Sequence, residues 1–237
     1  MNKKKILNLK ILIKDLGIAN TPGSFNYSSF ENSNKSPIYF LGSSPGGNPL
    51  KEKQTIIEHL NFMIKNPGFN EYYDGSWSPR GKPNPIGQSP LQKRVQYLLS
   101  SLMVNPRNAF STNLIFARFH SESNIQNYNN LATKCWPVHS YLIEKINPNL
   151  IIVLGNKCFE FVCSQMTDLS NIKQFKIDHG QGWTCKQSSG VLRGKRKNLI
   201  MLPHLSRFAI NQNKHKPIIE WIRCFLGNGK DFKPVMG

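Results

Sequence analysis

The feature that most constrains the fold is a series of short apolar runs that stop abruptly at glycine, proline or polar residues. The clearest run occupies residues 150–155, and similar runs occupy residues 37–41, 109–115 and 199–202. Continuous apolar runs of this length are typical of strands that are buried on both faces of a parallel sheet. The four runs therefore predict strands of a buried sheet.

Apolar residues at helical spacing separate these runs. They predict helices over residues 54–64, 91–102 and 217–226, a helix that ends at Ile146 before Pro148, and a further helix after residue 155. Strands that alternate with helices imply an α/β fold. We expect a single domain with a mainly parallel four-stranded sheet and helices on both faces.

At 237 residues, the chain is long enough for one sizeable core and short for two. We assign residues 37–237 to the main domain and residues 1–36 to an N-terminal extension that forms a helix and a loop. No apolar run approaches the roughly 20 residues needed to cross a bilayer. The five cysteines include no C-x-x-C pair. We therefore expect a monomeric, cytoplasmic protein with reduced thiols, no membrane segment and no metal site.

Two of the expected strands deliver polar loops that look like parts of one site. The sequence Gly-Ser-Ser-Pro-Gly occupies residues 42–46 directly after the first strand, and Pro-His-Leu-Ser-Arg occupies residues 203–207 after the last. Ligands bind α/β sheets at the carboxyl ends of the strands. We expect the two loops to meet there, with His204 as the main candidate for chemistry.

The charge balance points to a polyanionic partner. The chain carries 31 Lys and Arg against 13 Asp and Glu, a formal net charge of +18. Nucleic acid is the leading candidate for a partner of this charge. The alternative is a Lys- and Asn-rich genomic composition, but such a bias does not explain why acidic residues are so scarce. That scarcity also argues against a metal-dependent nuclease, which needs clustered carboxylates.

Two further segments are candidates for nucleic-acid contact. The long stretch of residues 67–90 contains Tyr73, Trp77 and Arg80, and aromatic residues beside cations suit base stacking and phosphate contact. Arg193, Lys195 and Arg196 form a basic turn before the last strand. The alternative is that neither segment contacts nucleic acid. Residues 67–90 would then be a solvent-exposed loop, and the basic turn would be a solvent-exposed hairpin.

Four ordered blocks of the sequence resemble the uracil-DNA glycosylase superfamily. Residues 42–46 match its G-x-x-P-G water-site motif, Thr112-Asn113 matches its base-reading asparagine, residues 148–155 match its P-x-x-I-x-x-L-G core strand, and residues 203–207 match its H-P-S-x-R loop. The resemblance implies a uracil-DNA glycosylase-like fold without a cofactor. It also implies an enzyme that flips a nucleotide out of duplex DNA and hydrolyses its N-glycosidic bond.

The resemblance also implies roles for individual residues. His204 donates to the departing base, and Asn113 reads the pyrimidine edge. Gly46 lets the backbone approach the base, within a pocket to which Gly42, Pro45, Tyr73 and Trp77 contribute. DNA contacts are expected from Ser206, Arg207 and Phe208, together with Arg80 and the basic turn.

The chain departs from the superfamily pattern in the first motif. Active relatives usually carry Asp, Asn or Glu at the second or third position, where this chain has Ser43 and Ser44. A serine can hold a water but is a poor base at neutral pH. Activity then depends on leaving-group stabilisation, depends on a group borrowed from Asn48, Glu71 or Asp74, or is absent. Leu205 stands where the last loop usually has proline.

Gly46 replaces the aromatic residue that blocks pyrimidine C5 substituents in the strict uracil branch. This glycine is compatible with a bulky 5-modified pyrimidine, such as occurs in the DNA of some bacterial viruses, and equally with a simple damaged base, because superfamily members with glycine there accept such bases. Antiviral defence and base-excision repair are both compatible settings. The leading hypothesis is a monofunctional DNA glycosylase that acts on a damaged or modified pyrimidine. The alternative is a non-catalytic DNA-binding module on the same fold.

Overall fold

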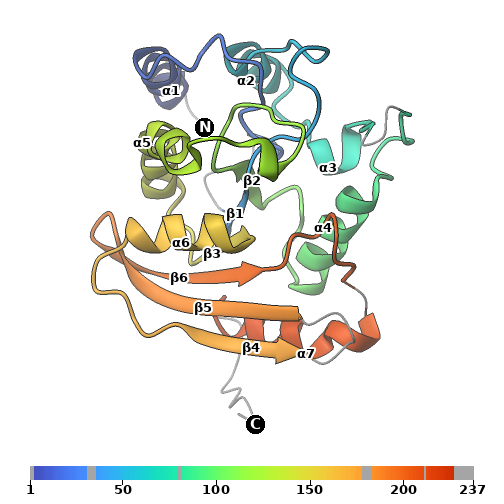
Figure 1. Ribbon diagram of the computed structural model, residues 1–237, viewed down its shortest axis with the longest axis vertical. Helices are drawn as coiled ribbons and strands as arrows, with labels where there is room; N and C mark the ends of the chain where they lie inside the picture. Colours follow the sequence, from blue (N-terminus) through green and yellow to red (C-terminus); the bar gives the residue numbers. More distant parts are fainter. Residues whose placement is uncertain (1–2, 31–35, 79–81, 178–182, 211, 227–237) are drawn as a thin grey trace.

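The computed structural model describes residues 3–30, 36–78, 82–177, 183–210 and 212–226. Strands and helices alternate as expected as far as α6, after which three strands follow one another without a helix (Figure 1). In chain order they are α1 (Lys3–Asp15), β1 (Ile38–Gly42), α2 (Ile56–Lys65), α3 (Glu71–Asp74), α4 (Pro90–Ser101), β2 (Phe110–Asn113), the 3₁₀ helix η2 (Glu122–Asn124), α5 (Tyr128–Ile146), β3 (Leu150–Leu154), α6 (Asn156–Ser164), β4 (Lys173–Ile177), β5 (Trp183–Leu192), β6 (Lys195–Leu202) and α7 (Gln212–Arg223).

The sheet has six strands in the order β2-β1-β3-β6-β5-β4. The four strands expected from the apolar runs, β1, β2, β3 and β6, are mutually parallel. The expectation of a four-stranded sheet is wrong, because β5 and β4 extend it with antiparallel pairing. These two strands carry polar residues such as Lys173, Lys176 and Lys186, so no continuous apolar run marks them.

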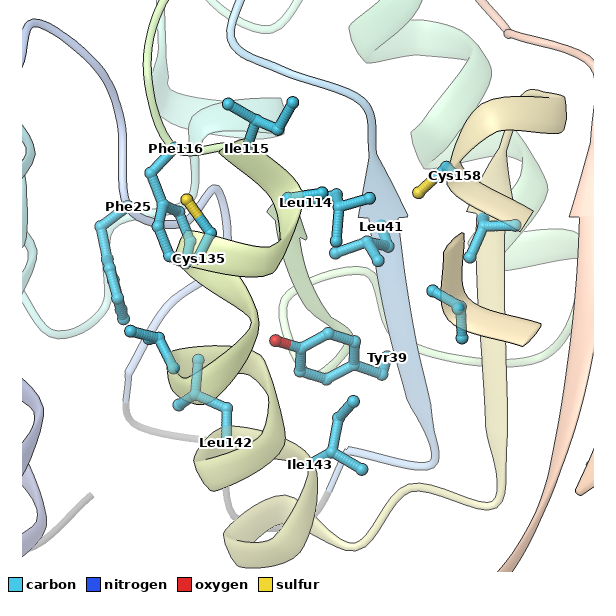
Figure 2. Close-up of a cluster of buried hydrophobic side chains, with 14 of the residues drawn as sticks. Phe25, Tyr39, Leu41, Leu114, Ile115, Phe116, Cys135, Leu142, Ile143 and Cys158 are labelled. Carbon is cyan, nitrogen blue, oxygen red and sulfur yellow. The ribbon is translucent and has the colours of Figure 1, made fainter. Parts of the chain in front are cut away.

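Helices cover both faces of the sheet, as predicted. One core cluster joins β1 and β3 to α1, α2, α5 and α6, and the other joins them to α3, α4 and α7. The side chains of β1 alternate between the clusters: Tyr39 and Leu41 face the first, and Ile38 and Phe40 face the second. Figure 2 shows Tyr39 and Leu41 in the first cluster, between α5 and α6.

The N-terminal segment packs into the same core as the sheet. Leu9 and Ile13 of α1 and Phe25 of the following loop are fully buried in the first cluster. The loop also bonds to β2, where the Tyr27 N–H donates to the Ser111 carbonyl over 2.8 Å. This segment therefore helps to build the edge at which β1 and β2 end.

Candidate active site

The carboxyl ends of the parallel strands bring the sequence motifs to one edge of the sheet. Gly42 at the end of β1 is in register with Asn113 at the end of β2. Leu154 at the end of β3 is in register with Leu202, which precedes the loop of His204. The motif loops therefore follow strands that end at one edge of the sheet, with β3 between the strand of residues 42–46 and the strand of His204.

The loop of residues 42–46 is fixed by the segment that follows β2. Backbone N–H groups of Leu114 and Ile115 donate to the carbonyls of Gly42 and Ser43 over 2.8 and 3.0 Å. Further along, the Phe119 N–H donates to the Pro45 carbonyl over 3.0 Å. The loop conformation is thus set by backbone pairing rather than by its own side chains.

Gly42 is required by the position of Asn113. A Cβ atom at residue 42 would lie 2.2 Å from Asn113 Oδ1, so any other residue would displace the amide. The Asn113 Nδ2 group donates to the hydroxyl of Tyr27 over 2.8 Å. Burial raises the pKa of Tyr27 to about 12, so this hydroxyl is protonated at neutral pH. Gly42 and Tyr27 together fix how Asn113 presents its amide.

Of the two serines of the first motif, Ser43 is already bonded to another side chain. Ser43 is buried, and its Oγ donates to the Tyr128 hydroxyl over 3.2 Å. Ser44 is half-buried beside it. Asn48 is turned toward its own loop, where Oδ1 accepts from the Leu50 N–H over 2.9 Å. The structure thus places Asn48 in a turn rather than beside the motif serines.

The two carboxylates considered as substitutes are committed to other contacts. Asp74 forms a bidentate ion pair with the Arg107 guanidinium, in which Nη1 and Nη2 donate to the two carboxylate oxygens over 2.8 and 2.7 Å. Glu71 accepts from the indole of Trp77 over 3.0 Å and lies 3.4 Å from His59 Nε2. Neither carboxylate is available to activate water in this arrangement.

His204 is held with one ring nitrogen free. Its Nδ1 accepts from the Ser206 backbone N–H over 3.2 Å and lies 2.7 Å from Ser206 Oγ. Burial lowers the pKa of His204, an effect that the nearby Glu122 charge opposes, so the ring is neutral at pH 7. Because Nδ1 accepts, the proton of the neutral ring is on Nε2. No described group bonds to Nε2, which leaves one N–H donor for a ligand.

The His204 loop is anchored by residues that the motif does not reveal. Arg94 of α4 donates from Nη1 to the carbonyls of Leu205 and Ser206 over 2.6 and 2.9 Å. Leu205 itself is fully buried in the second core cluster. These contacts tie the loop to α4 and to the second core cluster. No sequence signal singles out Arg94, because it stands on an ordinary helix 111 positions before Leu205.

A cavity of about 470 Å³ lies next to His204. Its volume is in the range of small-molecule sites in proteins. The lining combines polar groups of the α6 N-terminus and of β4 and β5 with apolar groups near His204, and consists of Gly155, Asn156, Gln174, Thr184, Lys186, Met201, Pro203, His204 and Phe208. The Asn113 and Gly42 pair lies on the other side of β3 from these strands.

The aromatic candidates fall on the Asn113 side of the site. Trp77 packs edge-on against Tyr27, the partner of Asn113, with ring centroids 5.7 Å apart. Tyr73 carries the Arg107 guanidinium over its ring at 5.0 Å. Arg80 lies outside the described residues. Trp77 therefore reaches Asn113 only through Tyr27. The ring of Tyr73 is instead covered by the Arg107 guanidinium.

Apart from Arg80, the residues predicted to contact DNA lie at the two ends of β6. Ser206 and Arg207 are exposed, and Phe208 is half-buried, all beside His204. Arg193, Lys195 and Arg196 lie at the turn between β5 and β6, at the opposite end of an eight-residue strand (Figure 1). At 3.3 Å per residue, this turn is about 20 Å or more from His204. The structure does not bring the basic turn to the site.

Comparison with known proteins gives no independent assignment: no family model and no curated protein matches this chain. Among the described residues, no group of three or more His, Cys, Asp or Glu side chains is arranged to hold a metal ion. None of the described helices has the length and apolar character that a membrane span needs.

Proposed function

We propose that this protein is a DNA glycosylase that excises a damaged or modified pyrimidine and leaves an abasic site. The observation that carries the proposal is the free Nε2–H of His204, held at the same sheet edge as Asn113 and the residue 42–46 loop. The formal net charge of +18 supports DNA as the partner. A cavity of about 470 Å³ lies beside His204, but its lining includes none of the predicted base-contacting residues Gly42, Pro45, Gly46, Tyr73, Trp77 and Asn113.

The chemistry requires a donor at the departing base. When the bond between the sugar C1′ and the base nitrogen breaks, its electron pair leaves with the base, and the sugar becomes cationic. A preoriented N–H at a base oxygen stabilises this anion, and losing one such donor typically costs about 2.7–4 kcal/mol of transition-state stabilisation. A neutral His204 with its proton on Nε2 suits this role, because Ser206 fixes the ring orientation.

Asn113 suits recognition of the base edge. Its amide offers both an acceptor and a donor, and the Tyr27 hydroxyl occupies one donor of Nδ2. Asn113 is buried with Oδ1 against Gly42, so the second Nδ2 hydrogen is the group that we assign to a pyrimidine. Arg207, exposed beside His204, would contact the flanking phosphates.

One observation favours a non-catalytic DNA-binding module as the second candidate. The buried Ser43 hydroxyl is bonded to Tyr128, in the motif position where active relatives hold the water-activating residue. A protein of this kind would keep the basic surface and the fold while excising nothing.

The test uses duplexes that each carry one modified base: uracil, 5-hydroxymethyluracil, 5-hydroxymethylcytosine or its glucosylated form. With excess protein and subsequent alkali, we expect strand breaks at one or more of these bases and none without alkali. His204→Ala should slow single-turnover excision by about 10²–10³ without weakening DNA binding. His120→Ala, at an exposed histidine, is the matched control. Tight binding without any alkali-labile product would favour the non-catalytic module.

A further inference from the structure

The cavity beside His204 has one wall made largely by the two strands that the sequence did not predict. Gln174 of β4 and Lys186 of β5 line it, together with Met201 of β6. Gln174 is in register with Lys186, and Lys186 is in register with Met201. Met201 belongs to the core cluster that contains α6, whereas Cys185, next to Lys186, belongs to the other cluster. The wall therefore lies on the α6 face of the sheet.

This wall is open because α6 packs against β3 and β6. On the neighbouring strands, Gln174 is exposed and Lys186 is half-buried. The cavity of about 470 Å³ has room for a group much larger than a water molecule. The added strands therefore extend the sheet and also create a binding surface next to His204.

The lining offers hydrogen-bond donors and no negative charge. None of its nine residues is Asp or Glu. The side chains of Asn156, Gln174, Thr184 and Lys186 form no hydrogen bond or ion pair with any described residue. Lys186 Nζ lies 5.9 Å from the centre of the Phe159 ring of α6, which places the ammonium group on the α6 side of the sheet. The lining therefore suits a ligand that carries negative charge and accepts hydrogen bonds.

Other cations near this edge of the sheet already have partners. Arg118 pairs with Glu52 over 2.9 Å, and Arg94 donates to the carbonyl of Leu205 over 2.6 Å. Lys186 has no such bond to a described group, although it shares the cavity with His204. A half-buried ammonium group without an acceptor costs stability unless a ligand supplies one.

We propose that this cavity binds a backbone phosphate of the DNA strand that carries the excised base, with Lys186 as the cation that pairs with it. The inference rests on the DNA partner of the proposed function. His204 lines the cavity and, in that function, donates to the departing base. The bound phosphate is therefore one that flanks the excised nucleotide. The base itself lies toward Asn113, which the cavity lining does not include.

The experiment measures binding to a duplex that contains one tetrahydrofuran residue, a stable abasic-site analogue that requires no excision. We expect Lys186→Gln to reduce the slope of log affinity against log salt by about 1, the effect of losing one phosphate contact. Lys186→Arg keeps the charge and should keep the wild-type slope. The matched control is Lys173→Gln, at an exposed position of β4 next to Gln174 and on the opposite face of the strand. Thermal unfolding establishes that all three variants are folded.

A second measurement locates the phosphate. In the same duplex, each phosphate that flanks the tetrahydrofuran is replaced in turn by a neutral methylphosphonate. One replacement should weaken binding of the wild type and of Lys173→Gln by about tenfold, the loss expected for one hydrogen bond to a charged group. The same replacement should have little effect on Lys186→Gln, because that variant has already lost the partner of the phosphate.

Equal salt slopes in the wild type and Lys186→Gln overturn the proposal, and so does an equal reduction in Lys186→Gln and Lys173→Gln. The cavity takes a small anion instead of DNA if inorganic phosphate at constant ionic strength shifts the NMR signals of His204 while the slope of Lys186→Gln is unchanged. That result also overturns the proposal.

These outcomes do not depend on excision, because the abasic analogue is bound without a reaction. If the wild type excises no modified base but Lys186→Gln lowers the salt slope, the glycosylase function fails and the phosphate site stands. If the wild type excises a base and the slope of Lys186→Gln is unchanged, the phosphate site fails and the glycosylase function stands.

Discussion

The hydroxyl of Tyr39 on β1 lies 2.9 Å from Nδ1 of His139 on α5, within the first core cluster. The other ring nitrogen, Nε2, lies 2.9 Å from the Leu114 carbonyl. Because a carbonyl can only accept, Nε2 carries the proton and Nδ1 accepts from Tyr39. Figure 2 shows the Tyr39 hydroxyl directed from β1 toward α5. The neutral ring therefore ties α5 to β1 and to the residue that follows Asn113.

This arrangement predicts a loss of stability in acid. Burial lowers the pKa of His139 from 6.5 to about 4. The unfolded chain then binds the proton more readily, so the stabilisation is complete above pH 6.5 and is lost as the pH falls toward 4. The difference corresponds to roughly 3 kcal/mol. Urea unfolding near pH 7.5 and pH 4.5 should show a smaller acid loss for His139→Gln than for the wild type. Equal losses in both proteins would contradict the assignment.

Asn113 is expected to select the base. Asn113→Asp replaces an amide donor with an acceptor and leaves one group of the pyrimidine edge unpaired, a mismatch worth roughly 1–3 kcal/mol. Excision rates should therefore change unequally across a panel of pyrimidines. Tyr27→Phe, which removes only the partner of the amide, should give a smaller change in the same direction. A uniform loss on every base would mean that Asn113 is structural.

The sequence predicted the elements that have a strong local signal. The fully buried β3 is a continuous apolar run, and the strand-end positions of Asn113 and His204 follow from such runs. Strand β5 was missed because polar residues, among them the buried Gln187 and Ser188, interrupt any apolar run along it. Tyr27 and Arg94 were missed for another reason. Each reaches the site through hydrogen bonds to a distant segment, and no local sequence pattern records those bonds.

Gly46 is expected to set the size of the accepted base. A Cβ at this position would meet no atom within 4 Å, so a larger side chain would extend into open space rather than into the protein. Gly46→Phe should lower excision of 5-substituted pyrimidines by at least about tenfold, the loss expected for about 1.4 kcal/mol of steric exclusion. Uracil should be retained as a substrate. Gly46→Ala is the control for the loss of glycine itself. If Gly46→Phe has the same preference among pyrimidines as the wild type, Gly46 does not line the base pocket.

Binding to unmodified duplex DNA is expected to be mainly electrostatic. If at least six phosphates are contacted, affinity should fall by about 10³ or more between roughly 50 and 200 mM salt. Arg207→Ala, beside His204, should reduce the slope of log affinity against log salt by about 1. Arg196→Ala, at the far end of β6, should leave that slope unchanged. If Arg196→Ala reduces the slope and Arg207→Ala does not, the DNA contacts the β5–β6 turn instead.

Arg94 is expected to act as a positioning residue for His204. Its Nη1 donates to the Leu205 and Ser206 carbonyls, so Arg94→Ala removes both bonds that tie the loop to α4. A shift of about 1 Å in a catalytic group can cost up to 10² in rate. We expect Arg94→Ala to lower the maximal single-turnover rate by about tenfold or more, while the protein concentration for half-saturation stays the same. Arg94→Lys keeps a donor, so its maximal single-turnover rate should lie between the rates of the wild type and of Arg94→Ala.

The control for this prediction is Lys93→Ala, which removes an adjacent exposed cation and should change DNA affinity at most slightly. A general loss of charge would instead raise the half-saturating concentration in both alanine variants. If Arg94→Ala excises at the wild-type rate, the burial of Leu205 alone is sufficient to hold the loop. In that case core packing of Leu205 holds the loop in place without the help of α4.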